Sequence, residues 1–273
     1  MLGKGGFSEV YKGFDIENMR WVACKIHQYQ ANWSEIAKNN YIKHALRENK
    51  IHSNLDHPNI VKLYDTVEMD KNSFCTVLEF CNGGDLALFR KKVKTIPESE
   101  AKLIVKQLLS AIKYLKDQVE LIIHYDLKPQ NIMFHNGEIK ITDFGLCKVM
   151  AANEKSKMEL TSQGVGTYWY LPPECFMMGD HDKPPKISQK VDIFSIGVIF
   201  YELVFGKKPF GHNMSQERIF KEQVMLRSKM VDFPKNPILS KEGKDLIVRL
   251  LKHDQDMRID VDEAYNCSYL KKK

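Results

Sequence analysis

The chain has 273 residues, of which 43% are hydrophobic and 28% are charged, and its formal net charge is +6. This length exceeds a usual single core and predicts one two-lobed domain or two small domains, and the apolar content excludes a disordered chain. The basic runs at 90–94 and 271–273 lack interleaved aromatic residues, so we interpret them as exposed surface. Such a surface favours an acidic protein partner, and we expect no direct nucleic-acid binding.

The cysteines show neither a CxxC pair nor the spacing of zinc ligands, so the sequence predicts neither a disulfide framework nor a metal knuckle. Reduced thiols in a cytosolic or nuclear protein are the simplest interpretation of Cys24, Cys75, Cys81, Cys147, Cys175 and Cys267. No apolar run reaches membrane-spanning length, and residues 1–10 form a glycine-rich loop instead of a secretory signal, so we expect no membrane association. The chain begins almost inside its first motif, which suggests a trimmed chain or a domain of a longer protein.

The first 80 residues predict a small lobe of strands around one helix. Residues 10–14, 21–26 and 74–78 are rich in β-branched and aromatic side chains, which is typical of strands. Between them, residues 37–54 place Ile42, Leu46 and Ile51 at helical spacing.

After Gly83 and Gly84 the pattern becomes helical and predicts a larger, mainly α-helical lobe. One long amphipathic helix is indicated by apolar residues at helical spacing, namely Ala101, Ile104, Val105, Leu108, Ile112 and Leu115. Further helices are predicted at about 190–205, 215–228, 240–252 and 261–270. The fold class is therefore α+β, with a mainly β N-terminal part and a mainly α C-terminal part.

The stretch from Gly3 to Val10 is a glycine-rich turn between strands. Glycines let backbone amides approach phosphate oxygens, but an ordinary hairpin turn would explain this stretch equally well on its own. A dinucleotide-binding fold would need glycine where Ser8 stands and a helix afterwards, and the P-loop motif GxxxxGK[ST] is absent. The lysine in Ala23-Cys24-Lys25, downstream on a predicted strand, favours phosphate binding.

The run HYDLKPQN at 124–131, followed by Asp143-Phe144-Gly145, supplies every polar group that phosphoryl transfer needs. It contains a carboxylate for a hydroxyl nucleophile, a lysine for the phosphate and two oxygen ligands for magnesium. In these motifs the chain resembles protein kinases. The resemblance implies a bilobal kinase domain over 1–273, with an N-lobe at 1–80, a C-lobe at 81–273, a hinge at about 79–84 and an activation segment at 143–174.

The kinase resemblance assigns catalytic roles by position. Asp126 would orient the substrate hydroxyl and Lys128 would stabilise the transferred phosphate, while Asn131 and Asp143 would ligate Mg²⁺. Lys25 would bind the α- and β-phosphates of ATP and pair with Glu48, whose register is fixed by the LDHPNIV run at 55–61. Glu35 is the competing partner, but it precedes the predicted helix and lacks that register.

The same resemblance assigns the nucleotide site. Backbone groups of Glu79 and Cys81 would bond the adenine, Leu78 would be the gatekeeper and Asp85 would reach the ribose. The remaining ATP-binding positions would be Leu2, Gly3, Gly5, Val10, Ala23 and Met133. Each of these residues also has a simple interpretation as part of a turn or a core.

A lysine two positions after the catalytic aspartate is typical of serine/threonine kinases by the same resemblance. Thr167 supports this preference, since it resembles the threonine that contacts the Asp–Lys pair. We also expect Glu174 to pair with Arg258 and Asp192 to anchor the backbone of the catalytic loop. Those two contacts would support the site without taking part in the chemistry.

Four segments resemble the Tousled-like kinases, namely GGFSEVYK at 5–12, SFCTVLE at 73–79, IHYDLKP at 123–129 and ELTSQGVGTYWYLPPECF at 159–176. The similarity covers nearly the whole chain. That family implies nuclear serine/threonine kinases that act on histone chaperones in chromatin assembly. It also implies coiled-coil segments before the kinase domain, so we expect oligomerisation only through regions outside this chain.

Tyr125 stands where the kinase motif usually has arginine. That arginine binds a phosphorylated activation loop through charge-assisted hydrogen bonds, which the neutral phenol of Tyr125 cannot form. We therefore predict weak dependence on phosphorylation of the activation segment. Ser156, Thr161 and Ser162 are the candidate phosphorylation sites, with nearby lysines to receive the phosphate.

Two alternatives to a Tousled-like kinase remain. A pseudokinase scaffold would bind partners without transferring phosphate, but it would be expected to lack one or more of Lys25, Glu48, Asp126, Asn131 and Asp143. A serine/threonine kinase of another subgroup would differ in its choice of substrate.

Overall fold

The computed structural model of the chain describes residues 1–5, 8–28, 33–70, 73–150, 157–160, 164–177 and 184–271, except for the side chain of Ala37. The chain divides into two compact units. Unit 1 comprises Met1–Gly84 and Met133–Gly145, and unit 2 comprises Asp85–Ile132 and Leu146–Lys273. The sequence predicted a break near residue 80, and the segment Met133–Gly145 packs with the N-terminal residues.

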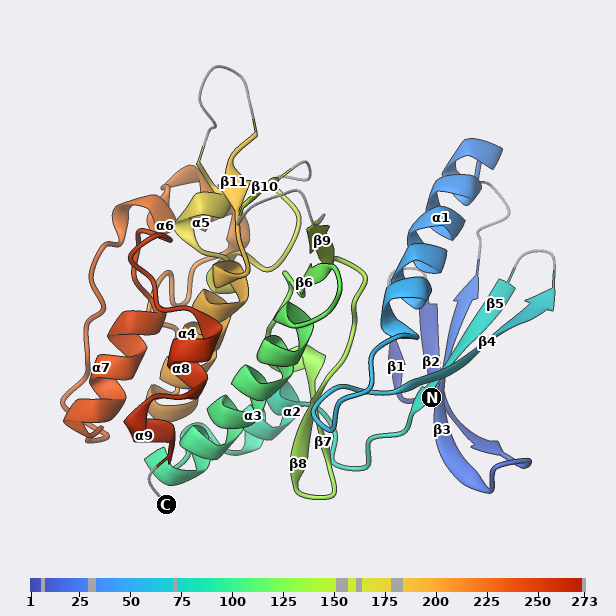
Figure 1. Cartoon of the computed structure of the whole chain (residues 1–273), viewed down its shortest axis with the longest axis horizontal. Helices are drawn as coiled ribbons and strands as arrows, with labels where there is room; N and C mark the ends of the chain where they lie inside the picture. Colours follow the sequence, from blue (N-terminus) through green and yellow to red (C-terminus); the bar gives the residue numbers. More distant parts are fainter. Residues whose placement is uncertain are drawn as a thin grey trace. The chain divides into compact units, whose positions relative to one another are not determined.

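Unit 1 contains a five-stranded antiparallel sheet in the order β1-β2-β3-β5-β4 (Figure 1). The strands are β1 (Gly3–Lys4), β2 (Ser8–Asp15), β3 (Arg20–Gln28), β4 (Leu63–Asp70) and β5 (Ser73–Glu79). The strands predicted at 10–14, 21–26 and 74–78 are confirmed and are the three central ones. The sequence did not predict β4, since its side chains are mostly exposed and its register shifts twice, as suits an edge strand.

The helix predicted at 37–54 is confirmed as α1 (Glu35–His52). It contacts β4, where Asn49 Nδ2 donates to Thr66 Oγ1 at 3.1 Å. Ala45 and His52 are buried in this helix, and His52 Nε2 lies 2.6 Å from the carbonyl oxygen of Val61. The helix is thus fixed to its own unit by polar contacts as well as by packing.

A second hairpin joins unit 1 through residues distant in the sequence. It consists of β7 (Ile132–His135) and β8 (Glu138–Ile141), connected by Asn136 and Gly137, both with positive φ. Asn59 Nδ2 donates to the carbonyl of Ile139 at 2.9 Å. The amide of Gly83 donates to the carbonyl of Phe134 at 2.9 Å. Asp143 lies two residues after the end of β8, so the hairpin sets its place in unit 1.

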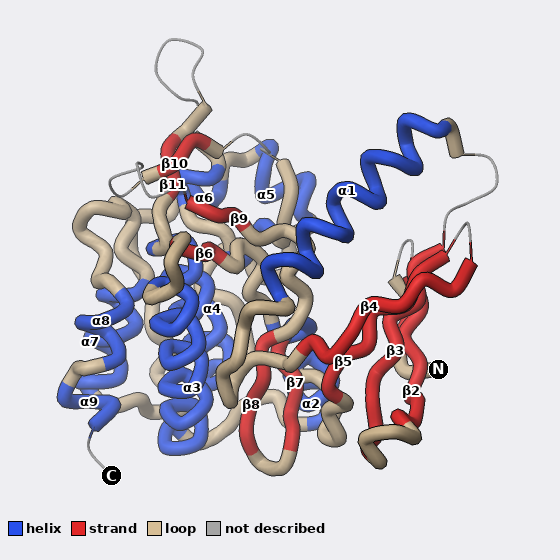
Figure 2. Tube along the Cα trace, turned by 45° about the vertical axis from the view of Figure 1, so that its right-hand side comes forward, coloured by secondary structure: helices blue, strands red, loops and turns tan. Residues whose placement is uncertain are grey.

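Unit 2 is mainly helical, and α3 (Glu98–Lys116) and α4 (Lys190–Phe205) pack side by side in its interior (Figures 1 and 2). Nearly every residue of α4 is buried, and the helix ends at Gly206, whose φ of 70° is left-handed. The remaining helices are α2 (Leu86–Lys92), α5 (Gln216–Lys221), α6 (Val224–Arg227), α7 (Lys241–Leu250), α8 (Val261–Tyr265) and α9 (Ser268–Lys271).

Short strands and turns complete unit 2. The strands β6 (Leu121–Ile123) and β9 (Lys148–Met150) pair with each other, as do β10 (Met158–Glu159) and β11 (Lys186–Ile187). Single 3₁₀ turns lie at Pro129–Asn131, Tyr168–Tyr170 and Pro173–Cys175. These segments carry the catalytic-loop motif at 124–131 and the TYWYLPPE run at 167–174.

Three helix predictions for unit 2 are confirmed and two need correction. The long helix with Ala101 to Leu115 is α3, the helix at 190–205 is α4, and the helix at 240–252 is α7. The stretch 215–228 is two short helices, because Gln223 adopts a left-handed backbone with φ 51° between α5 and α6. The stretch 261–270 is also divided, since α8 ends at Tyr265 and α9 begins at Ser268.

Among the residues that the structure describes, no helix combines the length and apolar character needed to cross a bilayer. All six cysteines carry free thiols.

Candidate active site

Lys25 lies in the middle of β3 and forms an ion pair with α1. Its Nζ lies 3.1 Å from Glu48 Oε1 and 3.9 Å from Asp143 Oδ1. The predicted contact between Lys25 and Glu48 is confirmed, whereas Glu35 pairs with Lys38 on the exposed start of the helix. Burial favours the neutral amine, but the two carboxylates outweigh it and raise the pKa of Lys25. Lys25 therefore keeps its positive charge, as phosphate binding requires.

Asp143 presents a carboxylate from the end of the second hairpin in unit 1. Its backbone is left-handed, with φ 66°, and its side chain is 48% exposed. The next residue, Phe144, is buried with its ring 4.6 Å from the ring of His52. A Cβ at Gly145 would lie 3.3 Å from Glu48 Oε2 and 3.4 Å from Asp143 Oδ1. The buried phenylalanine anchors the turn and leaves the aspartate open enough to ligate a metal ion.

In unit 2, Asp126 is the centre of a network of four polar side chains. Its Oδ2 accepts from Lys128 Nζ at 2.6 Å and from Asn131 Nδ2 at 3.1 Å, and its Oδ1 accepts from Thr167 Oγ1 at 3.1 Å. Lys128 Nζ also lies 3.2 Å from Thr167 Oγ1. The predicted contact of Thr167 with the Asp–Lys pair is thus confirmed. The network holds a carboxylate and an ammonium side by side, as hydroxyl activation and phosphate stabilisation require.

Asn131 is oriented by the same loop. Its Nδ2 donates to the backbone carbonyl of Asp126 at 2.9 Å as well as to the carboxylate. With its amide nitrogen engaged in this way, Asn131 offers its Oδ1 as the ligand for a cation. An amide oxygen is a hard donor of the kind that Mg²⁺ prefers, and so is the carboxylate that Asp143 presents in unit 1, so each residue by itself fits its predicted role.

Asp192 anchors the backbone of the catalytic loop, as predicted. Its two carboxylate oxygens accept from the amides of His124 and Tyr125, each at 2.8 Å. Burial raises the pKa of Asp192 to about 7, and the two amide hydrogen bonds oppose that rise. This anchor fixes the two residues that precede Asp126.

The predicted pair of Glu174 and Arg258 is also confirmed. Two guanidinium nitrogens of Arg258 donate to the two carboxylate oxygens of Glu174, at 2.7 and 3.0 Å, and both side chains are buried. Such a bidentate pair fixes the end of the activation segment within unit 2.

Most of the predicted ATP-binding residues of unit 1 lie on or beside the five-stranded sheet, and Met133 lies on the second hairpin. Val10 pairs with Lys25 between β2 and β3, and Ala23 pairs with Leu78 between β3 and β5. The amide of Glu79 donates to the carbonyl of Lys62 at 2.8 Å, which leaves the predicted adenine contact to other backbone atoms of this segment. The other predicted positions of this unit are Leu2, Gly3 and Gly5 near β1, Cys81 after β5, and Met133 on β7.

Two predicted nucleotide-site residues also have local structural roles. Cys81 is buried, and burial together with the nearby Glu79 carboxylate raises the pKa of its thiol to about 12, so the thiol is unreactive. Asp85, in unit 2, caps α2 by accepting from the amide of Leu88 at 2.8 Å. The contacts of these residues with ATP stay predictions, as do the catalytic roles above.

The activation segment is described only in part. Ser156, Thr161 and Ser162 lie outside the described residues, and so do Gly6 and Phe7 of the glycine-rich turn. Weak dependence on phosphorylation therefore stays a prediction.

Sequence reasoning missed one buried ion pair in unit 2 and misjudged one of its members. The interpretation of Arg90 as exposed surface is wrong. Its Nη1 lies 2.5 Å from Glu202 Oε1, and the two side chains are 15% and 5% exposed. Tyr170 donates its hydroxyl to Glu202 Oε2 at 2.6 Å. An arginine in a run of lysines gives no sequence signal of burial, because only the fold shows that α2 faces α4.

Known proteins similar to this chain are kinases, in agreement with the geometry of the site. The protein kinase domain family matches residues 1–270. The chain is 53% identical to serine/threonine-protein kinase tousled-like 2 of Xenopus tropicalis, over 99% of this chain and 40% of that protein. It is also 53% identical to tousled-like 2 of Homo sapiens, over 99% of this chain and 36% of that protein. It is 52% identical to serine/threonine-protein kinase TOUSLED of Arabidopsis thaliana, over 96% of this chain and 38% of that protein. The chain thus spans about two fifths of the length of these relatives.

Proposed function

The chain belongs to the protein kinase family, and from that premise we propose that it transfers the γ-phosphate of ATP to serine and threonine hydroxyls of proteins, as a Tousled-like kinase. The observation that carries the proposal is the network around Asp126, in which one carboxylate contacts Lys128, Asn131 and Thr167. A hydroxyl nucleophile needs such a carboxylate, and the developing phosphate charge needs such a lysine.

Each unit contributes different chemistry to this proposal. Unit 1 supplies the charged Lys25 for the ATP phosphates, held by Glu48, and the carboxylate of Asp143 for Mg²⁺. Unit 2 supplies Asp126 as the group that orients the hydroxyl, and the oxygen of Asn131 as a second metal ligand. Bound Mg²⁺ neutralises phosphate charge, and the protein residues position the reactants.

The preference for serine and threonine is supported by the contact of Lys128 with Thr167 and by the names of the relatives, which are serine/threonine kinases. We further propose that histone chaperones are among the substrates and that the protein works in the nucleus. The support for both is the resemblance to Tousled-like kinases in the segments quoted above.

The first experiment measures Mg²⁺- and ATP-dependent phosphate transfer to a generic serine/threonine substrate and to a histone chaperone. Asp126→Asn is expected to abolish transfer to both. Asp245→Asn is the matched control, because Asp245 is an exposed aspartate on α7, and it should leave transfer unchanged.

The outcomes separate the candidate functions. Loss of transfer in Asp126→Asn with a preference for the chaperone would support a Tousled-like kinase. Transfer to the generic substrate alone would leave the kinase chemistry standing and contradict the chaperone proposal. ATP binding without any transfer by the folded wild-type chain would contradict the proposed activity and favour a binding scaffold.

A further inference from the structure

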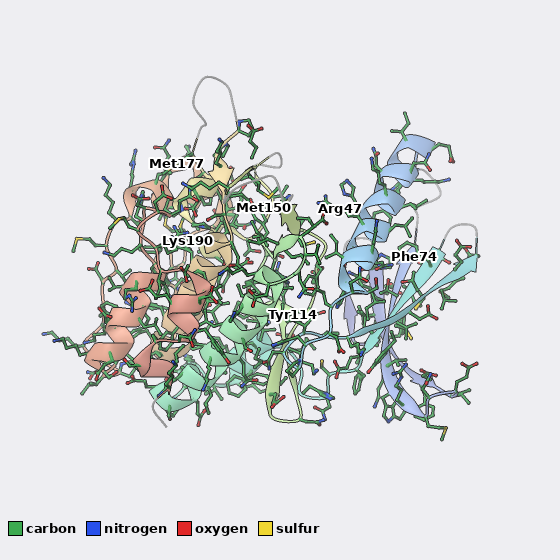
Figure 3. The ribbon with its side chains drawn as sticks, viewed as in Figure 1. Arg47, Phe74, Tyr114, Met150, Met177 and Lys190 are labelled. Atoms are coloured by element: carbon green, nitrogen blue, oxygen red, sulfur yellow. The ribbon has the colours of Figure 1, made fainter. Side chains whose placement is uncertain are left out.

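Two basic segments of unit 2 that are far apart in the sequence meet at its surface. One is the end of α2 with the residues after it, at 90–94, and the other is the turn after α4, at 207–208. The amide of Ile96 donates to the carbonyl of Leu203 at 3.0 Å (Figure 1, with side chains in Figure 3). The fold thus places the two basic segments side by side.

The close approach of the two segments depends on Gly206. Its φ of 70° is left-handed, and a Cβ at this position would lie 3.1 Å from the carbonyl oxygen of Lys94. A side chain here would strain the backbone and push the segments apart. On the interior side, the ion pair between Arg90 and Glu202 holds the same two elements together.

The surface formed in this way is strongly positive. Neither 86–97 nor 203–216 contains an aspartate or a glutamate. We name it the basic surface, and its charged side chains are Arg90, Lys91, Lys92, Lys94, Lys207 and Lys208. All of these lysines except Lys208 are exposed to solvent. The predicted exposure of the run at 90–94 therefore holds for its lysines.

Glu202, the buried carboxylate beside the basic surface, is already engaged. Its Oε1 lies 2.5 Å from Arg90 Nη1 and 3.6 Å from Lys208 Nζ. Its Oε2 accepts from the hydroxyl of Tyr170 at 2.6 Å. Burial, together with the neighbouring lysines, lowers the pKa of His212, as expected where positive charge is in excess. Glu202 thus leaves the exposed lysines without neutralisation.

The basic surface adjoins the segment that carries Thr167. Lys208 Nζ lies 4.9 Å from the centroid of the Trp169 ring, and Trp169 Nε1 donates to the carbonyl of Gly211 at 2.9 Å. Trp169 is two residues after Thr167, whose hydroxyl bonds to the carboxylate of Asp126. Two residues span at most about 7 Å of chain. A protein segment bound to the basic surface would therefore lie close to the site that orients the substrate hydroxyl.

From these observations we propose that the basic surface is a docking site for an acidic segment of the protein substrate, rich in aspartate and glutamate and near the serine or threonine that receives the phosphate. The proposal rests on the proposed kinase function. Exposed ammonium groups attract carboxylates and orient the segment that carries them. Docking raises the local concentration of the acceptor hydroxyl, so it lowers the KM for the substrate and leaves the chemical step unchanged.

Positive charge also attracts nucleic acids, but single-stranded nucleic acids gain much of their affinity by stacking bases on aromatic rings. Trp169, which contacts the basic surface, is half-buried and has the ammonium of Lys208 over its ring. It offers little open face to a base. An acidic peptide needs no such platform, so the surface suits a protein segment better.

The first test measures the binding of a fluorescent peptide of glutamate and glycine to the whole chain by anisotropy. This probe carries no acceptor hydroxyl. Lys94→Glu combined with Lys207→Glu changes one exposed residue of each basic segment, both outside helices. The combination should weaken binding about tenfold or more, because it replaces two attractive contacts with two repulsive ones.

A matched control separates the basic surface from the net charge of the chain. Lys241→Glu combined with Lys252→Glu makes the same change in net charge at exposed positions on and just after α7. That element contributes no side chain to the basic surface. The control should bind the peptide within about twofold of the wild type, since exposed charges are screened beyond a Debye length of about 8 Å.

The second test measures phosphate transfer to serine peptides that differ only in a flanking tract of glutamates, lysines or glycines, placed before or after the serine. The wild-type chain should show a lower KM for a glutamate peptide than for the glycine peptide, with kcat within about twofold. In Lys94→Glu with Lys207→Glu, this preference in kcat/KM should fall about tenfold. The lysine peptide should gain in the same variant, because the charges are exchanged.

Equal weakening of peptide binding in the docking variant and in the control would overturn the proposal, because net charge would then explain the effect. An unchanged preference for the glutamate peptide in the docking variant would do the same. Binding of a single-stranded oligonucleotide without binding of the acidic peptide would assign the surface to nucleic acid and contradict the proposal. If the wild-type chain transfers no phosphate, the proposed function fails, whereas anisotropy still decides whether the surface binds acidic segments.

Discussion

Arg90 on α2 and Glu202 on α4 form an ion pair in the interior of unit 2. The atoms Nη1 and Oε1 lie 2.5 Å apart, and the side chains are 15% and 5% exposed. Tyr170, in the TYWYLPPE run, donates its hydroxyl to the other oxygen of the same carboxylate, at 2.6 Å. The glutamate thereby joins two helices and the activation segment of this unit.

Arg90→Ala should lower the free energy of unfolding by about 1.5–3 kcal/mol, because it removes the charge-assisted hydrogen bond to the buried Glu202 carboxylate. Lys208 Nζ, 3.6 Å from Glu202 Oε1, still compensates part of that charge. Urea unfolding measures this loss. Lys91→Ala, an exposed neighbour on the same helix, is the matched control and should change stability by less than about 0.5 kcal/mol. Adding Glu202→Gln to Arg90→Ala should recover part of the loss, and failure to do so would contradict the electrostatic explanation.

Lys25→Met should lower the rate of phosphate transfer by about 10²-fold or more, since it removes a preorganised charge that stabilises the phosphates. Glu48→Gln should also lower the rate, because the amide no longer holds the ammonium of Lys25 by charge. Steady-state transfer assays measure both effects. Glu35→Gln is the matched control on the same helix, and it should retain full activity because Glu35 contacts Lys38 at an exposed position. Equal losses in Glu35→Gln and Glu48→Gln would show that helix stability, and not the ion pair, is responsible.

The sequence predicted best those elements and contacts that depend on the local side-chain pattern or on the spacing of motifs. The three central strands, α1, α3, α4 and α7 followed from side-chain pattern, and the contacts of Lys25 with Glu48 and of Asp126 with Thr167 followed from the kinase resemblance. These contacts join residues far apart in the chain, so composition and periodicity alone could not supply them.

What the sequence could not predict depends on packing between distant segments. Arg90 looked exposed because it stands among lysines, yet the packing of α2 in unit 2 buries it against Glu202. The segment Met133–Gly145, which contains most of the second hairpin, belongs to unit 1. It is held there by the hydrogen bond from Asn59 to the carbonyl of Ile139, and no local sequence pattern predicts that contact. The break between α5 and α6 depends on the left-handed backbone of Gln223, a conformation that a glutamine in the sequence does not predict.

Gly83→Ala should destabilise unit 1 by about 1–3 kcal/mol, because the segment after β5 passes very close to the second hairpin. A Cβ at this position would lie 2.6 Å from Cβ of Phe134, well inside van der Waals contact. The amide of Gly83 also donates to the carbonyl of Phe134, so the two segments cannot move apart without losing that bond. Chemical unfolding measures the loss. Gly3→Ala, where a Cβ would meet open space, is the control, and an equal loss in both variants would contradict the steric argument.

Lowering the pH from 6.5 toward 4 should destabilise the protein through His27. This side chain is buried, stacks on Phe74 with ring centroids 4.3 Å apart, and lies 2.7 Å from the hydroxyl of Tyr41 through Nδ1. Burial, aided by the charge of Lys25 and opposed by Asp143, lowers the pKa of His27 from 6.5 to about 4.

The direction follows from proton binding in the two states. Between pH 6.5 and 4 the unfolded chain binds a proton at His27 that the folded protein excludes, so stability rises with pH across this range and is fully present above it. The lowered pKa corresponds to at most about 3 kcal/mol. Urea unfolding at pH 7 and at pH 4.5 should show part of this loss, and His27→Gln should show a smaller difference between the two pH values. An NMR titration of the His27 ring tests the premise directly, and an apparent pKa near 6.5 in the folded protein would contradict it.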